Sequence, residues 1–531
     1  MTRSSSHKNT FFGGAAILTA GIAIVKIIGA LYKIPLGRML DDIGFGHFNN
    51  AYAIYNLLLM ISTAGLPVAL SKTISEANAL GRRNQVNRVF RVALIAFLVL
   101  GAASCLVMFV YAEPLAHWQG DNLAAPAVRT MSLSCFFVCV VSAYRGYAQG
   151  HSDMVPTAVS QVLEALTKLI IGLSLCWYLL RLGYGSDIAA AGAIGGVTAS
   201  GLVSLVYMIL VHKRDSREQK KGLDRPASSG NILKALAAIA IPITLSSSVV
   251  PITTYLDTVQ VQNRLQYAVG LSEHMAVSLY GCYQKAITIY NLPSSFMVAL
   301  TACIIPAIAA CIAQQDREGA GNIAESALRV GALLAFPAGI GLAVLSGPII
   351  HLIYPETNQE VAGYCLMVLG ISSIFVCMML LCNAILQANG RAALPIWIIA
   401  FGSAMKLIVN FVLVGTPAVG IKGAPIGTLV CFCFIAVTEL IIIKRVVPSS
   451  PRYSRVFAKP LVAALAMGAA AHVSCRVLTG ILGANLAVVA AICLGGLVYL
   501  VLALVMRVIS REDLALMPKG EKIAAILHIR K

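Results

Sequence analysis

The chain has 531 residues, of which 58% are hydrophobic and 12% are charged, and its formal net charge is +18 at pH 7. A composition this apolar excludes a soluble globular protein and indicates a membrane protein. The basic residues are spread over the segments between apolar stretches, so they do not form a nucleic-acid-binding patch, and we expect no nucleic-acid partner.

Apolar stretches of about 20 residues, the length at which a helix crosses a bilayer, recur along the whole chain. They predict an all-α polytopic membrane protein with about fourteen transmembrane helices. The predicted spans lie near residues 11–32, 48–70, 92–112, 128–148, 157–180, 189–211, 236–257, 276–308, 330–353, 361–386, 394–414, 420–443, 460–479 and 485–507.

Two local features interrupt this series. Residues 71–91 combine apolar and basic positions and predict an amphipathic helix on the membrane surface, which would act either as a gate or as a lipid anchor. In the seventh span, Pro242 and Pro251 flank a hydroxyl-rich stretch. Because proline breaks the helical hydrogen-bond ladder, this span is predicted to be bent or locally unwound.

Lysine and arginine concentrate on one side of the predicted topology. With the N-terminus inside, the cytoplasmic segments include the basic loop 212–234 and the basic tail, whereas the outer loops 113–127, 354–360 and 480–484 contain neither residue. The positive-inside rule then predicts a plasma-membrane protein with both termini in the cytoplasm. The basic segments would also contact the head groups of anionic membrane lipids.

An internal duplication divides the chain. Ile54-Tyr55-Asn56-Leu57 recurs as Ile289-Tyr290-Asn291-Leu292, and Lys168-Leu169 recurs as Lys406-Leu407. The repeats predict two six-helix bundles related by a pseudo-two-fold axis, an arrangement typical of alternating-access transporters. The predicted domains are an N-terminal bundle at 1–211, a basic linker at 212–234, a C-terminal bundle at 235–445, and two extra spans with a tail at 446–531.

No enzymatic arrangement is present in the sequence. It lacks a Walker motif, a His-Glu-x-x-His motif and a Gly-x-Ser-x-Gly motif, so we expect neither an enzyme nor an ATPase. The fourteen cysteines show no metal-ligand spacing, and we expect no metal and no cofactor.

Charged residues inside spans are the candidates for function, because the bilayer tolerates them only beside a partner or a watery cavity. Glu164 precedes Lys168 by one helical turn, and we expect this pair to be a structural ion pair. The excess of lysine predicts a cationic cavity for an anionic substrate such as a pyrophosphate. The expected contacts are Lys26 and Lys285, with Lys33, Arg38 and Arg264 as a second set, and the candidates for cavity lining are Tyr55, Asn56, Tyr290 and Asn291.

Tyr55 and Asn56, like their repeat partners, have a second interpretation. Asparagine within membranes often forms hydrogen bonds between helices, so these residues would serve packing instead of lining a cavity.

Several motifs resemble a known family. Gly29-Ala30-Leu31-Tyr32-Lys33-Ile34-Pro35-Leu36, Ser62-Thr63-Ala64-Gly65-Leu66-Pro67 and Tyr144-Arg145-Gly146-Tyr147-Ala148-Gln149-Gly150 are similar to segments of the stage V sporulation protein B group. This group belongs to the polysaccharide-transporter branch of the MOP exporter superfamily and is related to the lipid II flippase MurJ. The resemblance implies a fourteen-helix flippase that moves an undecaprenyl-pyrophosphate-linked sugar precursor for peptidoglycan or spore-cortex synthesis, with cell-wall synthesis proteins as candidate partners.

The resemblance also implies where the substrate binds. MurJ-type flippases carry cations in spans 1, 2 and 8, and Lys26 and Lys285 would fill the first and last of these roles. Span 2 has no basic residue here, so that part of the pattern is missing. The last two spans would extend a groove for the lipid tail.

Four other functions are alternatives to this hypothesis. A cation-coupled multidrug exporter of the MATE type would need acidic residues in the N-terminal half, where Glu164 is the clear mid-span candidate. An exporter of another lipid-linked polysaccharide unit fits the same features as the main hypothesis. A glycosyl transferase would need acidic or histidine clusters in a long outer loop, and the predicted outer loops are short; a non-transporting scaffold stays open.

The predicted topology is tested by cysteine accessibility in intact cells. A cysteine at position 228, replacing Ser228, should react only with reagents that reach the cytoplasm, and one replacing Asn358 should react from outside. Labelling of both positions from the same side would contradict the topology.

Overall fold

The computed structural model describes residues 3–218, 222, 224–447 and 453–506, and all regular secondary structure in them is helical. This confirms the predicted all-α fold class. Twelve helical segments in the described residues are long and apolar enough to cross a membrane, and each coincides with a predicted span. The two other predicted spans lie within α1 (Arg3–Met39) and α11 (Glu273–Ala313), helices of 37 and 41 residues.

The basic tail beyond residue 506 and the lysines at 220 and 221 of the predicted linker lie outside the described residues.

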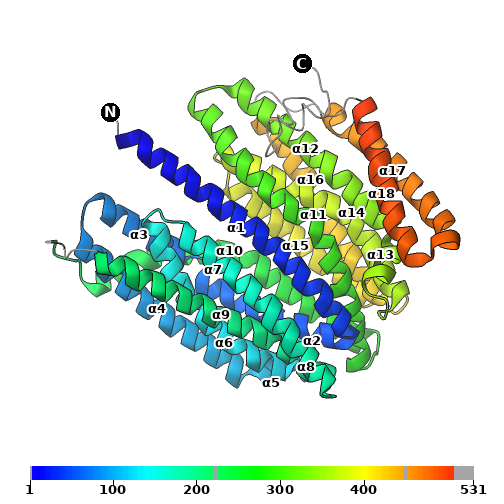
Figure 1. The fold of residues 1–531 in the computed structure, drawn as a ribbon, viewed down its shortest axis with the longest axis horizontal. Coiled ribbons are helices and arrows are strands. Elements are labelled where there is room, and N and C mark those ends of the chain that lie inside the picture. The colour runs from blue at the N-terminus through cyan, green and yellow to red at the C-terminus, as the bar shows by residue number, and fades with distance from the viewer. Residues whose placement is uncertain (1–2, 219–221, 223, 448–452, 507–531) are drawn as a thin grey trace. The chain divides into compact units, whose positions relative to one another are not determined.

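The chain forms two compact units, residues 1–281 and 282–531. Figure 1 labels their helices along the chain. The helices of the first unit after α1 are α2 (Asp42–Thr63), α3 (Leu66–Ala79), α4 (Arg83–Val110), α5 (Ala112–Gln119), η1 (Asn122–Ala124), α6 (Ala125–Gly150), α7 (Val155–Thr167), η2 (Lys168–Gly172), α8 (Leu173–Arg181), α9 (Ser186–Glu218), α10 (Ser229–Asn263) and η3 (Arg264–Ala268).

The second unit contains α11 from Cys282 onward. It continues through α12 (Arg317–Val344), α13 (Ser346–Ile353), α14 (Gln359–Ala388), α15 (Ala393–Val414), η4 (Gly420–Lys422), α16 (Gly423–Val446), α17 (Tyr453–Leu482) and α18 (Ala484–Val505).

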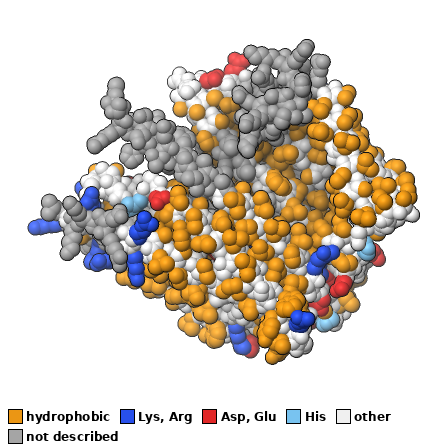
Figure 2. Space-filling view, viewed as in Figure 1, with side chains coloured by type: hydrophobic (Ala, Val, Ile, Leu, Met, Phe, Trp, Pro, Cys, Tyr) orange, Lys and Arg blue, Asp and Glu red, His pale blue; other side chains and the backbone are white. Residues whose placement is uncertain are grey.

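In the first unit, α2 lies among α1, α6, α9 and α10 and buries an aromatic row that includes Phe45, Phe48 and Tyr55. Elsewhere in the unit, small residues let helices approach closely, as is usual in membranes. A Cβ on Gly196 of α9 would lie 2.2 Å from the Cα of Gly172 at the end of η2. Figure 2 shows a mostly hydrophobic face over α4, α6 and α9, with lysine and arginine gathered toward its ends, as expected of a surface that faces lipid.

Helix α10 begins inside the predicted linker 212–234 and packs in the first unit, against α2 and α3. The contact is intimate, because a Cβ on Gly65 would lie 2.0 Å from the carbonyl oxygen of Ala240. The Gly65 amide also donates to Thr244 Oγ1 over 3.1 Å. The boundary between the two compact units therefore lies at residue 281 and not in the segment 212–234. The domain boundaries derived from the sequence duplication describe where each repeat begins and ends, and they stay a prediction.

The predicted local unwinding of the seventh span is wrong. Helix α10 continues through both Pro242 and Pro251, and the backbone departs from α geometry only afterwards, in the π-helical segment η3. A membrane helix accommodates proline in this way because neighbouring groups satisfy the freed carbonyls.

The predicted amphipathic helix at 71–91 is also not one element. Helix α3 ends at Ala79, and Gly81 adopts a positive φ of 66°, a conformation that favours glycine and ends the helix. Residues from Arg83 onward form the first turns of α4. The apolar positions of both pieces nevertheless bury in one cluster with α6 and α10.

Asp224 in the middle of the predicted linker is bound to the start of α4. The Asp224 carboxylate accepts hydrogen bonds from the backbone amides of Asn84 and Gln85 over 2.9 and 2.8 Å. These are orphan donors of a helix N-terminus, where negative charge is favourable. Partial desolvation, which alone would raise the pKa of Asp224, is outweighed by these hydrogen bonds, so the pKa lies below its usual value.

In the second unit, α12, α14 and α16 form the core, and α17 packs against α12 and α18. The two helices added after the duplication are thus joined to the unit through α12. Glycines again permit the contact: a Cβ on Gly468 would lie 2.7 Å from Ile340, and one on Gly495 would lie 3.1 Å from Ala471.

Candidate functional site

Three lysines of the first unit form a cationic cluster, which comprises Lys26 and Lys33 of α1 and Lys168 of η2. Lys33 lies within electrostatic reach of the other two. The spacing of seven residues places Lys26 and Lys33 on one face of α1, since seven residues make almost two helical turns. Lys26 is exposed, whereas Lys33 and Lys168 are half-buried.

One stripe of α2 completes this cluster. The Lys33 ammonium donates to Asn49 Oδ1 over 3.5 Å and lies 5.8 Å from the centre of the Tyr52 ring. Because Asn49, Tyr52 and Asn56 are spaced three and four residues apart, they share one helix face. Asn56 lines a cavity of about 240 Å³ with residues of α10 that include Pro251 and Thr254.

Lys168 occupies the first position of the π-helical segment η2. Such segments are rare within α-helices and are frequent at functional sites. Its ammonium lies 5.3 Å from the centre of the Tyr32 ring, and the Tyr32 hydroxyl donates to the carbonyl of Ala193 over 3.1 Å. The ring is therefore held from behind by α9 and presents its face to the cation.

The predicted ion pair between Glu164 and Lys168 is wrong. Glu164 accepts a hydrogen bond from Arg145 Nη2 of α6 over 2.9 Å. Arg145 also donates to Ser160 and Ser204, over 2.9 and 3.2 Å, so its guanidinium binds α7 and α9 together. Arginine presents a planar fork of donors that suits such a site better than a lysine one turn away on the same helix.

This correction changes the role of Lys168. Among the described residues, Lys26, Lys33 and Lys168 form no ion pair, and the contacts of Lys33 and Lys168 are an amide oxygen and aromatic faces. Among the described residues the cluster therefore has no carboxylate that neutralises it, and it can bind an anion.

The other predicted cations of the first unit lie elsewhere. Arg38 is exposed near the end of α1, and Arg264 is half-buried at the start of η3.

Lys285 belongs to the second unit. It lies on α11 with 2% of its surface exposed, and its ammonium is 5.5 Å from the centre of the Tyr354 ring. The prediction that Lys26 and Lys285 face one cavity concerns both units and stays a prediction.

The four predicted lining residues behave alike in the two units. Tyr55 and Tyr290 are buried, with 5% and 6% exposed, whereas Asn56 and Asn291 are exposed. The matching burial on α2 and α11 fits the duplication. The superposition of the two repeats stays a prediction.

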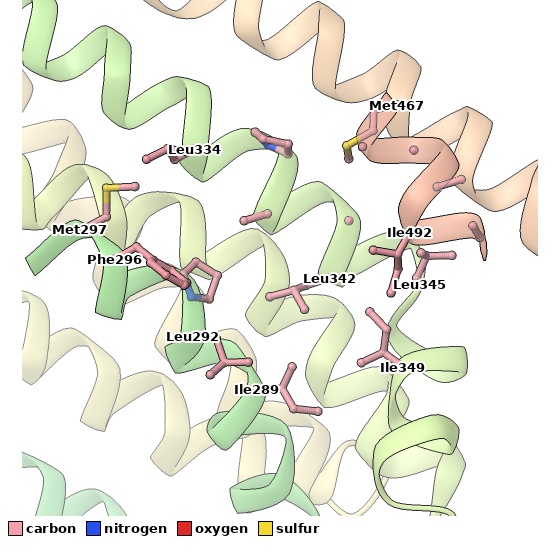
Figure 3. A pocket seen from close by; sticks show the side chains of 18 residues that line it. Ile289, Leu292, Phe296, Met297, Leu334, Leu342, Leu345, Ile349, Met467 and Ile492 are labelled. Carbon is pink, nitrogen blue, oxygen red and sulfur yellow. The ribbon is translucent and has the colours of Figure 1, made fainter. Parts of the chain in front are cut away.

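The second unit contains an apolar cavity of about 490 Å³ between α11, α12, α13, α17 and α18. Figure 3 shows Leu292 and Phe296 of α11 on one side, and Met467 and Ile492 of α17 and α18 on another. A cavity of this volume with hydrocarbon walls can take an apolar chain but offers almost nothing to a polar group.

The sequence identified the lysines but missed their surroundings. Asn49 and Tyr52 were detectable, since they stand seven and four residues before Asn56 on one face of the second span. Two features depend on which helices are neighbours. Lys168 lies near Lys33, and Glu164 pairs with Arg145. The apolar cavity had no local signal, because its walls resemble every other apolar helix face.

Comparison with known proteins places these features in context. The model of the polysaccharide biosynthesis protein family matches residues 11–311, and that of the MatE family matches residues 275–412. The lipid II flippase MurJ of Bacillus subtilis is 26% identical over 526 residues, which cover 92% of this chain and 94% of that protein. Stage V sporulation protein B of the same organism is 24% identical and covers 96% and 98%.

Solved structures show the same fold. The lipid II flippase MurJ in an inward closed conformation aligns with a TM-score of 0.71 and 15% identity, covering 92% of this chain and 98% of that one. An inward-facing multidrug resistance MATE family transporter of the MOP superfamily aligns with a TM-score of 0.63 and 16% identity, covering 80% and 97%.

The ion pair of Arg145 generates a stability prediction. Glu164→Gln leaves a guanidinium that is only 12% exposed without its carboxylate, so we expect a loss of about 2 kcal/mol. Lys168→Gln should change stability little, because Glu164 keeps its partner. The unfolding of purified protein in one detergent measures both. Equal destabilisation by the two variants would contradict the assignment of Arg145.

Proposed function

The chain belongs to the polysaccharide biosynthesis protein family, and from this premise we propose that it is a flippase for a lipid-linked glycan pyrophosphate. The substrate class is a polyprenyl chain joined through pyrophosphate to a sugar head group. The chain would be a transporter and not an enzyme, and the names of its relatives MurJ and stage V sporulation protein B support this direction.

The observation that carries the proposal is the cationic cluster. Lys26, Lys33 and Lys168 come from two separate helical segments and have no carboxylate partner among the described residues. Positive charge within a membrane helix is costly and is retained where it has a task. A pyrophosphate provides the missing negative charge, and ammonium groups bind it as mobile point charges.

The apolar cavity supports the other half of this substrate. Its walls include α17 and α18, the helices that follow the duplicated part. A polyprenyl tail consists of hydrocarbon and would gain from such a surface by dispersion and packing. In our proposal the tail occupies this cavity while the head group binds lysines.

Transport would proceed by alternating access. Binding of the pyrophosphate drives the change only if it interacts differently with the inward-open and outward-open states. We propose that Lys285 joins Lys26 and Lys33 at the pyrophosphate in one of these states and that Arg38 and Arg264 are further cations on the approach to the site.

The cellular role follows from the same resemblance. We propose that the protein acts in the plasma membrane, with both termini in the cytoplasm, and supplies a precursor of the lipid II type for peptidoglycan or spore-cortex synthesis. Cell-wall synthesis proteins are its expected partners, and membrane lipids would contact its basic segments.

A MATE-type exporter is the second candidate, because the MatE model matches residues 275–412. Cation coupling in such an exporter would need an available carboxylate in the first unit. Glu164 is engaged by Arg145, and this favours the flippase.

The lysines are tested by transport. Lys33→Gln with Lys168→Gln should reduce flipping at least tenfold, since the loss of two charge-assisted contacts costs about 1.5–3 kcal/mol each. The assay is rescue of a cell depleted of its lipid II flippase, with the head group on the outer leaflet quantified directly. The double variant Lys26→Ala, Lys285→Ala should also lose transport, and the corresponding arginine variants should keep part of it.

Lys72→Gln is the matched control, because Lys72 is exposed and only weakly paired with Glu76. It should transport at the wild-type rate. Full transport by both double variants would contradict the proposed site, and a wild-type chain that never exposes the head group would contradict the function.

The apolar cavity is tested by filling it. Gly496 lines the cavity and has open space around its Cβ position, so Gly496→Leu should fold normally and occlude the cavity. We expect weaker binding of a polyprenyl phosphate, measured by native mass spectrometry, and slower flipping. Gly480→Leu also adds a side chain in open space on α17 but outside the cavity, and it should leave both unchanged. Equal lipid binding by the two variants would contradict the proposal that the polyprenyl tail binds in this cavity.

A further inference from the structure

A second polar site lies in the first unit, near the N-terminal end of α2. It consists of His47 and Asn50 of α2, Asp121 between α5 and η1, and Gln262 of α10. All four side chains are almost completely buried, with 2% of His47 and 0% of the other three exposed. Two of them are ionisable, and neither belongs to the cationic cluster.

The contacts within this site are short. His47 Nδ1 lies 2.7 and 2.8 Å from the two carboxylate oxygens of Asp121. Asn50 Nδ2 donates to Asp121 over 2.5 Å. Asn50 and Gln262 exchange hydrogen bonds, since Gln262 Nε2 donates to Asn50 Oδ1 over 2.7 Å and Asn50 Nδ2 lies 3.2 Å from Gln262 Oε1.

The same site holds the end of α10 in place. Beside Gln262, Asn263 donates to the carbonyl of Trp118 over 3.1 Å, and Gln266 donates to that of Gly120 over 2.5 Å. Asp121 thus belongs to a short segment that α10 and η3 bind through main-chain contacts. The position of this segment depends on contacts from both α2 and α10.

The charge balance makes the site sensitive to a proton. With a neutral imidazole, the buried site carries the full negative charge of Asp121; with a protonated imidazole, it carries none. A buried net charge is costly, whereas a hydrogen-bonded pair of opposite charges is tolerated. Histidine is also the side chain that ordinarily changes its charge near neutral pH.

We propose that His47 and Asp121 form a proton-binding site whose occupancy is coupled to the seating of α10 and η3 on the segment 118–122. The proton binds while the site is closed and dry. It is released when the end of α10 leaves and water reaches the imidazole. Each opening of this end then releases one proton, and the inference concerns the first unit alone, independently of the substrate.

Other ionisable groups occur on the elements packed around the site. They are engaged at its edge: Asp41 caps Gly44 of α2, Lys33 donates to Asn49, His117 contacts Asn122, and Glu273 accepts from Asn122. Further carboxylates and arginines on these elements are Asp42, Glu113, Arg129, Asp257 and Arg264, and such groups do not change their charge near neutral pH in water. His117 is exposed, so it is the natural control for a histidine titrating without burial. His274, beside Glu273, is a second exposed histidine.

Hydrogen exchange measures the seating directly and needs no substrate. Purified full-length protein in lipid nanodiscs is labelled between pH 6 and pH 8, and exchange of the peptides covering 118–122 and 262–268 is corrected for the intrinsic pH dependence. Wild-type protection should fall as the pH rises, by up to about tenfold per pH unit for one linked proton. His47→Gln keeps an N–H donor for Asp121 but no titratable group, and its corrected protection should not depend on pH.

Two further variants complete the test. Asp121→Asn removes the buried negative charge, so a protonated imidazole would itself carry the uncompensated charge, and protection should no longer fall as the pH rises. This variant keeps the test decisive if His47→Gln folds poorly. His117→Gln should retain the wild-type dependence. A pH-independent wild type, or a His47→Gln variant with the wild-type slope, would overturn the proton site while leaving the proposed flippase activity untouched.

Discussion

Hydrocarbon offers no partner to a charge, so every ionised group inside a span must be compensated by the protein, by water or by a ligand. In the first unit the protein itself compensates a carboxylate in two places. Arg145 compensates Glu164 and binds α7 and α9 to α6. The Asp121 carboxylate is hydrogen-bonded by His47 and Asn50 of α2, and Asn50 is in turn hydrogen-bonded to Gln262 of α10. Neither network includes a lysine of the cationic cluster, which therefore remains available for a ligand.

In the cationic cluster the positive charge is left for a ligand to compensate. Lys33 and Lys168 contact an amide oxygen and aromatic rings, groups that tolerate a cation without neutralising it. The second unit contributes a large cavity with hydrocarbon walls. A lipid-linked pyrophosphate is itself divided into a charged head and an apolar tail, and its two parts need these two kinds of surface.

Helix α10 connects several of these features within the first unit. In its middle Thr244 accepts from Gly65, further along Pro251 and Thr254 line the cavity that Asn56 also lines, and at its end Gln262 joins the buried site of His47. A helix held by hydrogen bonds at its middle and at its end moves only when these are exchanged. A proton at one end is a chemically simple way to change that balance.

The sequence by itself determined the features that depend on one helix at a time. Hydropathy gave the spans, since the bilayer imposes their length, and the positions of Lys26, Lys33 and Lys285 followed by counting along each span. Tertiary structure alone decided which charges meet. Glu164 of α7 pairs with Arg145 of α6 and not with Lys168 one turn away on its own helix. The predicted surface helix is interrupted at Gly81, and α10 packs in the first unit. Pairing, cavity formation and burial arise from side chains of helices far apart in sequence, and local periodicity contains no information about which helices become neighbours.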